Sequence, residues 1–210
     1  MYVLLGDVIS SRKIKNRTSF QKNLENTYNK LNKKYEKDLF AEFKILKGLD
    51  EIGCVLICPD NVYKMIIDIL DSIYPNSMRF VLVFDSINTG LEGKNLTKMD
   101  GPAFHKAASM MSSLKESKST FTMSVYNKDL DKFIVDVANH IISLRQKWTI
   151  KQRNIIKEYE KTGKQKKVAD KYNISQQAVS NHIKNAQWKE INTIETSLTN
   201  IMKNIDKFER

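Results

Sequence analysis

Three acidic side chains lie where separate apolar segments of the chain would meet in one sheet. Asp7 lies at the end of the first apolar segment, and Asp50 and Glu51 lie in the tight connection, residues 47–51, between two later ones. Converging carboxylates supply the oxygen ligands that Mg²⁺ prefers beside nucleotide phosphates. The alternative, which the spacing alone favours, is that these acids are ordinary turn residues. A magnesium site with a nucleotide is therefore a hypothesis that needs further support.

A second polar group stands at the start of a predicted helix. Asp100-Gly101-Pro102 precedes an amphipathic stretch, and proline suits the first turn of a helix. The backbone N–H groups of such a helix start can bind an anion, with His105 one turn further on. The alternative is a plain helix start with Phe104 in the core and His105 in solvent.

The clearest pattern lies between Trp148 and Trp188, where the sequence predicts three short helices. Gly163 is expected to end the first helix, and the second is predicted from about residue 165 to residue 172. Asn173 then suits a tight turn with positive φ, and Ser175 suits the N-cap of the third helix. This arrangement predicts a helix-turn-helix.

The third of these helices has one apolar and one polar side. Val179, Ile183 and Ala186 are expected to face inward, so the polar residues lie opposite them. Those predicted to reach bases or phosphates of double-stranded DNA are Gln176, Gln177, Ser180, Asn181 and Lys184, with Lys166 and Lys167 of the preceding helix on the phosphate backbone. The alternative is a three-helix packing module that does not touch DNA.

The net charge agrees with a nucleic-acid partner. The chain of 210 residues carries a formal charge of +11, and from Arg145 onward it holds 15 Lys and Arg against 7 Asp and Glu. A concentrated basic excess attracts phosphates of any sequence. The alternative is a solvated, lysine-rich surface.

Cysteine use and hydropathy indicate the compartment. Cys54 and Cys58 are the only cysteines, and their spacing within a predicted strand suits neither a zinc pair nor a disulfide framework. No apolar run is long enough to span a membrane, and no secretory leader is recognised. We therefore expect a soluble cytoplasmic protein with reduced thiols and no membrane partner.

The elements before residue 147 predict an α+β domain. The expected order is strand, helix, two strands, helix and strand over residues 2–9, 17–35, 43–46, 52–58, 61–73 and 78–84. This β-α-β-β-α-β order is typical of a ferredoxin-like sheet. A helix from Pro102, a strand over 120–126 and a helix over 130–144 follow. We predict a sheet domain over 1–146, an all-α helix-turn-helix domain over 147–187 and an amphipathic helix over 188–210.

The last helix carries a heptad of apolar residues. They recur at intervals of three and four, at Ile191, Ile194, Leu198, Ile201, Ile205 and Phe208. Two chains could pair along this seam and form a homodimer that binds two DNA half-sites. The alternative is that the helix packs against its own chain.

Several motifs resemble those of the SatD family over nearly the whole chain. They are Gly6-Asp7-Val8-Ile9-Ser10-Ser11-Arg12, Asp50-Glu51, Arg79-Phe80 and the segment from Asp100 to His105. The segment 166–180 resembles the helix-turn-helix of sigma-factor region 4. The N-terminal domain of the family is similar to the palm of class III nucleotidyl cyclases and GGDEF diguanylate cyclases.

The resemblance to the cyclases implies a site that combines metal and nucleotide. In those enzymes, acids matching Asp7 and the Asp50-Glu51 hairpin hold two metal ions, which activate a ribose hydroxyl for attack on an α-phosphate. We accordingly assign Asp7, Asp50 and Glu51 to a Mg²⁺ site. The residues assigned to the nucleotide are Arg12, Asp100, Gly101 and His105.

The chain departs from the family pattern at the turn that carries Asp50 and Glu51, and no catalytic residue is assigned. Leu49 precedes Asp50 where the family usually has glycine, and the glycines expected around Val81, Val83 and Asp85 are absent. A bulky residue at such a turn hinders close approach of the backbone to phosphate. We therefore predict a DNA-binding transcription regulator whose sheet domain binds a nucleotide or is a degenerate cyclase. The alternative is an active Mg²⁺-dependent enzyme that cyclises or condenses nucleotides.

Overall fold

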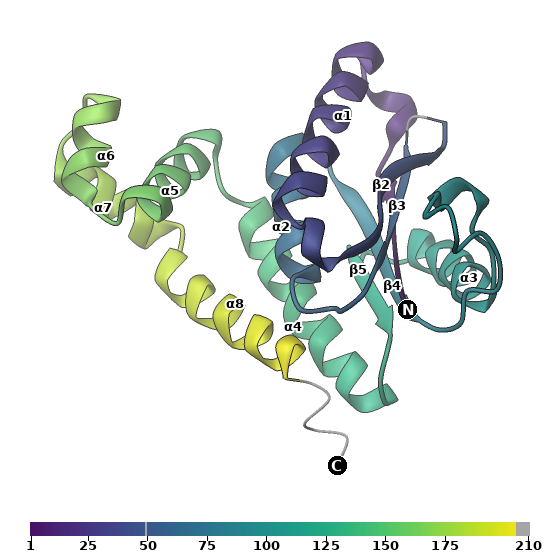
Figure 1. Cartoon of the computed structure of the whole chain (residues 1–210). Helices are drawn as coiled ribbons and strands as arrows, with labels where there is room; N and C mark the ends of the chain where they lie inside the picture. Colours follow the sequence, from purple (N-terminus) through teal and green to yellow (C-terminus); the bar gives the residue numbers. More distant parts are fainter. Residues whose placement is uncertain (49, 205–210) are drawn as a thin grey trace. The chain divides into compact units, whose positions relative to one another are not determined.

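The computed structural model describes residues 1–48 and 50–204, which form two compact units (Figure 1). Unit 1 holds residues 1–139 together with the end of the chain from Thr199, and unit 2 holds residues 140–198. The divisions lie within two helices, α4 (Lys128–Gln146) and α8 (Trp188–Lys203). The sequence instead predicts boundaries after residues 146 and 187.

Unit 1 is built on a mixed five-stranded sheet in the order β2-β3-β1-β4-β5. The strands are β1 (Tyr2–Val8), β2 (Leu39–Lys47), β3 (Glu51–Leu56), β4 (Met78–Phe84) and β5 (Phe121–Ser124). β1 is central and runs antiparallel to β3 and β4, whereas β4 and β5 are parallel. The predicted α+β class is confirmed, with β2 beginning earlier than the predicted residue 43.

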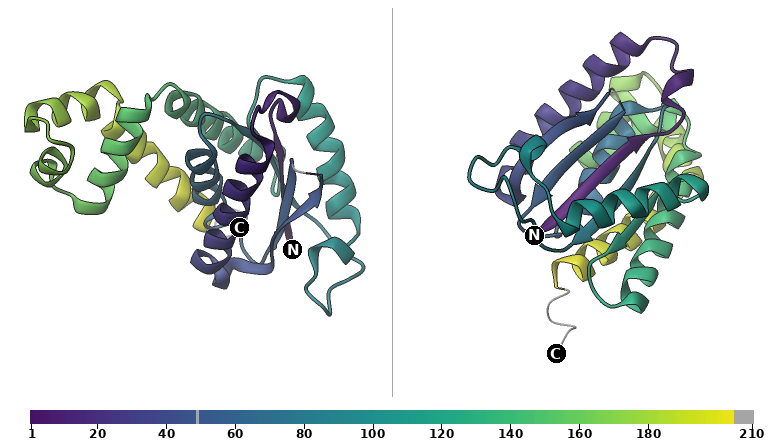
Figure 2. Two further views of the ribbon diagram at one scale, coloured as in Figure 1. Left: turned by 90° about the horizontal axis from the view of Figure 1, so that it is seen from above. Right: turned by 90° about the vertical axis from the view of Figure 1, so that its right-hand side faces the viewer.

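One face of the sheet is covered by α3 (Pro102–Glu116) (Figure 2). Val3 and Leu5 point to this face because successive strand residues alternate between faces. They are buried in one cluster with Ala103 and Ala107 of α3. Removing this apolar surface from water holds α3 on the sheet.

The opposite face is covered by α1 (Arg17–Lys34) and α2 (Val62–Ile73) (Figures 1 and 2). α1 buries Leu24 and Leu31 at helical spacing, and nearly every apolar residue of α2 is buried. Helices therefore lie on both faces of the sheet, which buries β1 throughout most of its length.

The edge strand β5 is fixed by α4 through one side chain. Asn139 accepts hydrogen bonds from the backbone N–H groups of Thr120 and Phe121, each at 2.9 Å, and donates to the carbonyl of Phe121 at 2.8 Å. An amide side chain that pairs with a strand in this way satisfies backbone groups that an edge leaves open.

Unit 2 contains three further helices besides the ends of α4 and α8. They are α5 (Ile150–Thr162), α6 (Gln165–Tyr172) and α7 (Gln176–Asn185). Throughout the described part of the chain, no helix is both long and apolar enough to cross a membrane.

The fold makes a specific prediction at Gly101, which precedes α3 with φ 152°. A Cβ atom there would lie 2.8 Å from the backbone nitrogen of Asn88. We expect Gly101→Ala to lower the free energy of unfolding by at least about 2 kcal/mol, because backbone strain and a clash add together. Urea denaturation followed by circular dichroism measures this change.

Gly93→Ala is the matched control, because a Cβ atom at Gly93 would meet nothing within 4 Å. We expect it to change the stability by no more than about 0.5 kcal/mol. Equal effects of the two substitutions would show that the close approach at Gly101 does not constrain α3.

Candidate functional site

Both ends of α5 are set by capping residues, Thr149 at the start and Gly163 at the end. Thr149 accepts a hydrogen bond from the N–H of Gln152 at 3.2 Å, and the Gln152 side chain accepts one from the N–H of Thr149 at 2.9 Å. This reciprocal pair satisfies donors that a helix start leaves unpaired. Gly163 ends α5 with φ 65°, as predicted.

The turn between α6 and α7 has the predicted backbone conformation. Asn173 lies in the left-handed region with φ 50°, and the N–H of Ile174 donates to the carbonyl of Ala169 at 3.1 Å. Ser175 caps α7 by accepting a hydrogen bond from the N–H of Ala178 at 3.1 Å. These local contacts confirm the predicted positive φ and the predicted N-cap.

α7 buries one side and exposes the other. Val179 and Ile183 are buried against Val168 and Ala169 of α6 and against Ile155 of α5. The polar residues predicted to meet DNA lie away from this core: Gln176, Gln177, Asn181 and Lys184 are exposed on α7, Ser180 is half-buried, and Lys166 and Lys167 are exposed on α6. All seven predicted positions thus belong to two adjacent helices.

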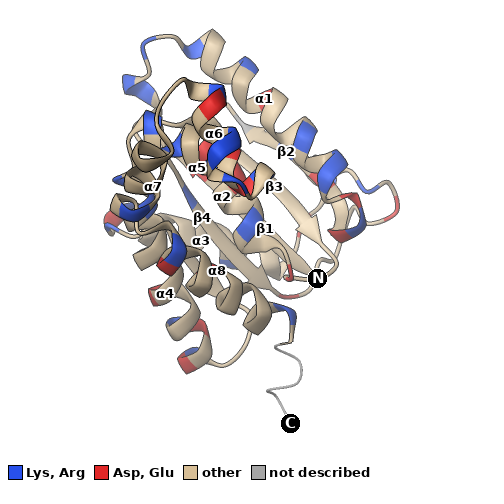
Figure 3. Cartoon of the chain, turned by 90° about the vertical axis from the view of Figure 1, so that its left-hand side faces the viewer, with Lys and Arg blue, Asp and Glu red and all other residues tan. Residues whose placement is uncertain are grey.

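The exposed side of α7 carries amides and positive charge without acids. The Gln177 side-chain nitrogen donates to the Asn181 oxygen at 3.2 Å, which places two amides side by side. The sequence contains no Asp or Glu between Asp170 and Glu190. Figure 3 shows the lysines of α6 and α7 in blue. Such a surface can hydrogen-bond to base edges and attract phosphate.

A buried tryptophan supports the far end of α7, which sequence reasoning did not anticipate. The indole N–H of Trp148 donates to the carbonyl of Ala186 at 2.9 Å, across 38 residues. The Arg145 guanidinium lies 4.5 Å from the centre of the Trp148 ring and pairs with Glu195 at 3.1 Å. The only signal in the sequence was a tryptophan directly before the helical segment.

Lys171, the third lysine of α6, is engaged within the unit. Its ammonium donates to the Glu158 carboxylate, and this hydrogen bond raises the pKa of Lys171 and lowers the pKa of Glu158. The contact links α6 to α5. Lys166 and Lys167 are therefore the better candidates for phosphate contacts from α6.

The predicted dimer seam of α8 is divided between buried and exposed positions. Ile191 and Leu198 are 1% and 2% exposed in the single chain, whereas Ile194 is 40% exposed. The predicted seam residues Ile205 and Phe208 lie outside the described residues. Burial within the single chain favours the alternative in which α8 packs against its own chain.

In unit 1, two of the three predicted metal ligands occupy paired positions on adjacent strands. Asp7 of β1 is opposite Glu51 of β3, with Arg79 of β4 on the other side of Asp7. The Asp7 carboxylate lies 2.7 Å from the ammonium of Lys115 at the end of α3. A cation of the chain itself therefore already neutralises Asp7.

Asp50 has a separate partner in the segment that follows β1. Its carboxylate accepts a hydrogen bond from the Ser11 hydroxyl at 2.6 Å, which joins the β2–β3 connection to the short 3-10 helix η1 (Ser11–Lys13). In the described residues, no three or more His, Cys, Asp or Glu side chains lie close enough together to hold a metal ion. The predicted role of Leu49 falls outside the described residues. The Mg²⁺ site stays a prediction.

The predicted nucleotide residues near α3 are far from these acids. Ala103 donates to Ser86, directly after β4, whereas Lys115 of the same helix reaches Asp7 at the opposite end of β1. With a helical rise of about 1.5 Å per residue, His105 lies roughly 15 Å along α3 from Lys115. Asp100, Gly101 and His105 therefore do not converge with the acids in one site.

The start of α3 also has few donors left for an anion. The N–H of Ala103 donates to Ser86, and those of Phe104 and His105 donate to the carbonyl of Gly101. Asp100 accepts from the N–H of Gly101 at 2.8 Å and lies 3.2 Å from the exposed His105 ring. This is the geometry of a plain helix start, the alternative interpretation of the motif.

The anchor of α7 yields a prediction for Trp148→Phe. The substitution removes the hydrogen bond to Ala186 inside a buried site, so we expect unfolding to become easier by about 1–3 kcal/mol. Trp188→Phe is the matched control, because its N–H donates to Glu160 at a more exposed position. Chemical denaturation of both variants checks this, and a control that loses as much stability would contradict the anchoring role.

Comparison with known proteins agrees with the motifs. No curated protein matches the chain. The family model described as the SatD family (SatD) matches residues 2–200. The match covers nearly all of both units, so the chain belongs to the SatD family.

Proposed function

We propose that this chain is a DNA-binding transcription regulator and that α6 and α7 form its helix-turn-helix. The observation that carries the proposal is the exposed side of α7, where Gln177, Asn181 and Lys184 lie opposite the buried Val179 and Ile183. In known helix-turn-helix proteins, the second helix lies in the major groove and uses such side chains on base edges.

The charge of unit 2 supports the same proposal. Residues 140–198 contain twelve Lys and Arg against five Asp and Glu. Basic residues around a reading helix supply the sequence-independent part of DNA affinity. A packing module without DNA contact has no need for an acid-free polar helix face.

For unit 1, we propose a ferredoxin-like domain that binds a nucleotide without turning it over. Support for the topology comes from the antiparallel neighbours of β1, since the order β2-β3-β1-β4 is the one expected of a β-α-β-β-α-β unit. Support for binding without catalysis comes from the ion pair between Asp7 and Lys115. We place the protein in the cytoplasm. A homodimer through α8 stays a prediction that the burial of Ile191 and Leu198 does not favour.

The proposal predicts two different responses of DNA binding to substitution. Lys167→Ala should weaken binding to all duplexes alike and reduce the slope of log affinity against log salt by about one, because one phosphate contact is lost. Lys167→Arg keeps the charge and should keep the slope. Titrations of fluorescent duplexes at several salt concentrations measure both variants.

Base recognition should respond at another position. Asn181→Ala is expected to relax the preference at one base pair by roughly 1–3 kcal/mol, measured on duplexes selected from random DNA. Asn192→Ala, at an exposed position of α8, is the matched control and should leave the preference unchanged. A wild-type chain that selects no sequence, or an Asn181 variant with unchanged preference, would show that α7 does not read bases.

The competing function is catalysis, which the opposition of Asp7 and Glu51 across β1 and β3 favours. Because Lys115 neutralises Asp7, we expect no pyrophosphate release when the protein is incubated with nucleoside triphosphates and Mg²⁺ or Mn²⁺. Release that disappears in Asp7→Ala would overturn this expectation and identify an enzyme of the cyclase type.

A further inference from the structure

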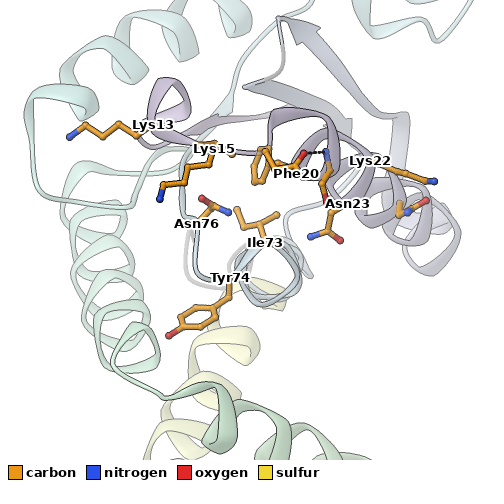
Figure 4. Close-up of a pocket in the computed structure, with 12 residues that line it drawn as sticks. Lys13, Lys15, Phe20, Lys22, Asn23, Ile73, Tyr74 and Asn76 are labelled. Atoms are coloured by element: carbon orange, nitrogen blue, oxygen red, sulfur yellow. Dashed lines mark hydrogen bonds between the residues drawn. The ribbon is translucent and has the colours of Figure 1, made fainter.

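We propose that a pocket in unit 1, between the start of α1 and the end of α2, binds the polyphosphate group of a small ligand (Figure 4). The pocket has a volume of about 640 Å³ and is formed by residues from segments 13–26 and 73–76. Sites for small molecules commonly have volumes of roughly 300–1,000 Å³. The pocket thus has room for a ligand of nucleotide size.

The charge of the lining is positive and uncompensated. Lys13, Lys15 and Lys22 all line the pocket, and no acidic residue does. The sequence contains no Asp or Glu between Asp7 and Glu25. Within the described part of the chain, none of the three lysines forms an ion pair, in contrast to several lysines elsewhere. A cluster of like charges without counter-ions in the chain favours an anionic partner.

The pocket combines these charges with polar donors and an apolar floor. Figure 4 shows Lys15 and Asn76 directed toward the hollow beside Phe20 and Ile73, with Lys13 and Lys22 extending to either side. Phe20 and Ile73 are 8% and 1% exposed, so they form part of the core. The Asn76 side chain makes no hydrogen bond within the described residues, which leaves its amide available to a ligand.

The distribution of charge selects a polyphosphate over a single phosphate. The three lysines come from η1, from the connection before α1 and from α1 itself, so their charges are spread along the pocket instead of meeting at one point. A chain of phosphates can contact several ammonium groups at once, and the apolar floor can accept an organic part. Of the residues that the sequence assigned to a nucleotide, only Arg12 adjoins this pocket, as the neighbour of Lys13.

Calorimetric titration of the full chain at fixed salt tests the proposal, with inorganic tripolyphosphate and a nucleoside triphosphate as separate ligands. We expect binding of at least one, and a loss of roughly tenfold or more in Lys13→Gln/Lys15→Gln/Lys22→Gln, because several charge-assisted hydrogen bonds are removed. Tighter binding of the nucleoside triphosphate would identify a nucleotide, and equal binding an inorganic polyphosphate.

The matched control is Lys30→Gln/Lys33→Gln/Lys37→Gln, which removes the same charge from exposed positions outside the pocket. It should keep the affinity within about twofold, since surface charges at a distance are screened by salt. Absence of binding by the wild-type chain, or equal losses in the two triple variants, would overturn the proposal. So would a pocket variant that loses DNA binding while its triphosphate affinity is unchanged. The proposal does not depend on the function of α7.

Discussion

The buried contact between α6 and α7 determines what the other side of α7 can do. In the core of unit 2, the small side chain of Ala169 on α6 packs in one cluster with Val179 and Ile183 of α7. With 3.6 residues per turn, burial of Val179 and Ile183 directs Gln177 and Asn181 to solvent. The left-handed turn at Asn173 fixes the angle at which α7 leaves α6. The proposed reading surface is thus a consequence of packing.

In unit 1, the two ends of α3 make different polar contacts. The acids Asp7 and Glu51 lie at one end of β1, and Lys115 satisfies Asp7 there. The other end of α3 uses its backbone donors within the chain. On the α1 side, Lys13, Lys15 and Lys22 line a pocket and form no ion pair within the described residues. The sequence predicts a nucleotide site beside the acids. The charges of the folded chain favour the lysine-lined pocket instead.

Features that depend on neighbouring residues were predictable from the sequence. The end of α5 at Gly163, the turn at Asn173 and the cap at Ser175 each follow from a conformation that the residue itself favours. The order of strands and helices in unit 1 also follows, because alternating and helical patterns of apolar residues differ in period. Even the early start of β2 is only a boundary difference.

Contacts between distant segments were not predictable in this way. The bond from Trp148 to Ala186 and the pair of Lys115 with Asp7 join residues that share no local pattern. The apolar residues of α8 fit a heptad, but a heptad does not state whether the partner is another chain. The acid-free basic run between Asp7 and Glu25 does not stand out when charge is counted over whole domains. Its role depends on the fold, which brings Asn76 into the same pocket.

Whether α7 lies in the DNA groove can be measured by mapping the backbone amide shifts of the protein by NMR. The isotopically labelled full chain would be titrated with a duplex selected from random DNA. We expect the largest shifts on residues 176–184, with smaller ones around Lys166 and Lys167. Shifts confined to unit 1, or no shifts at saturating duplex, would contradict this expectation.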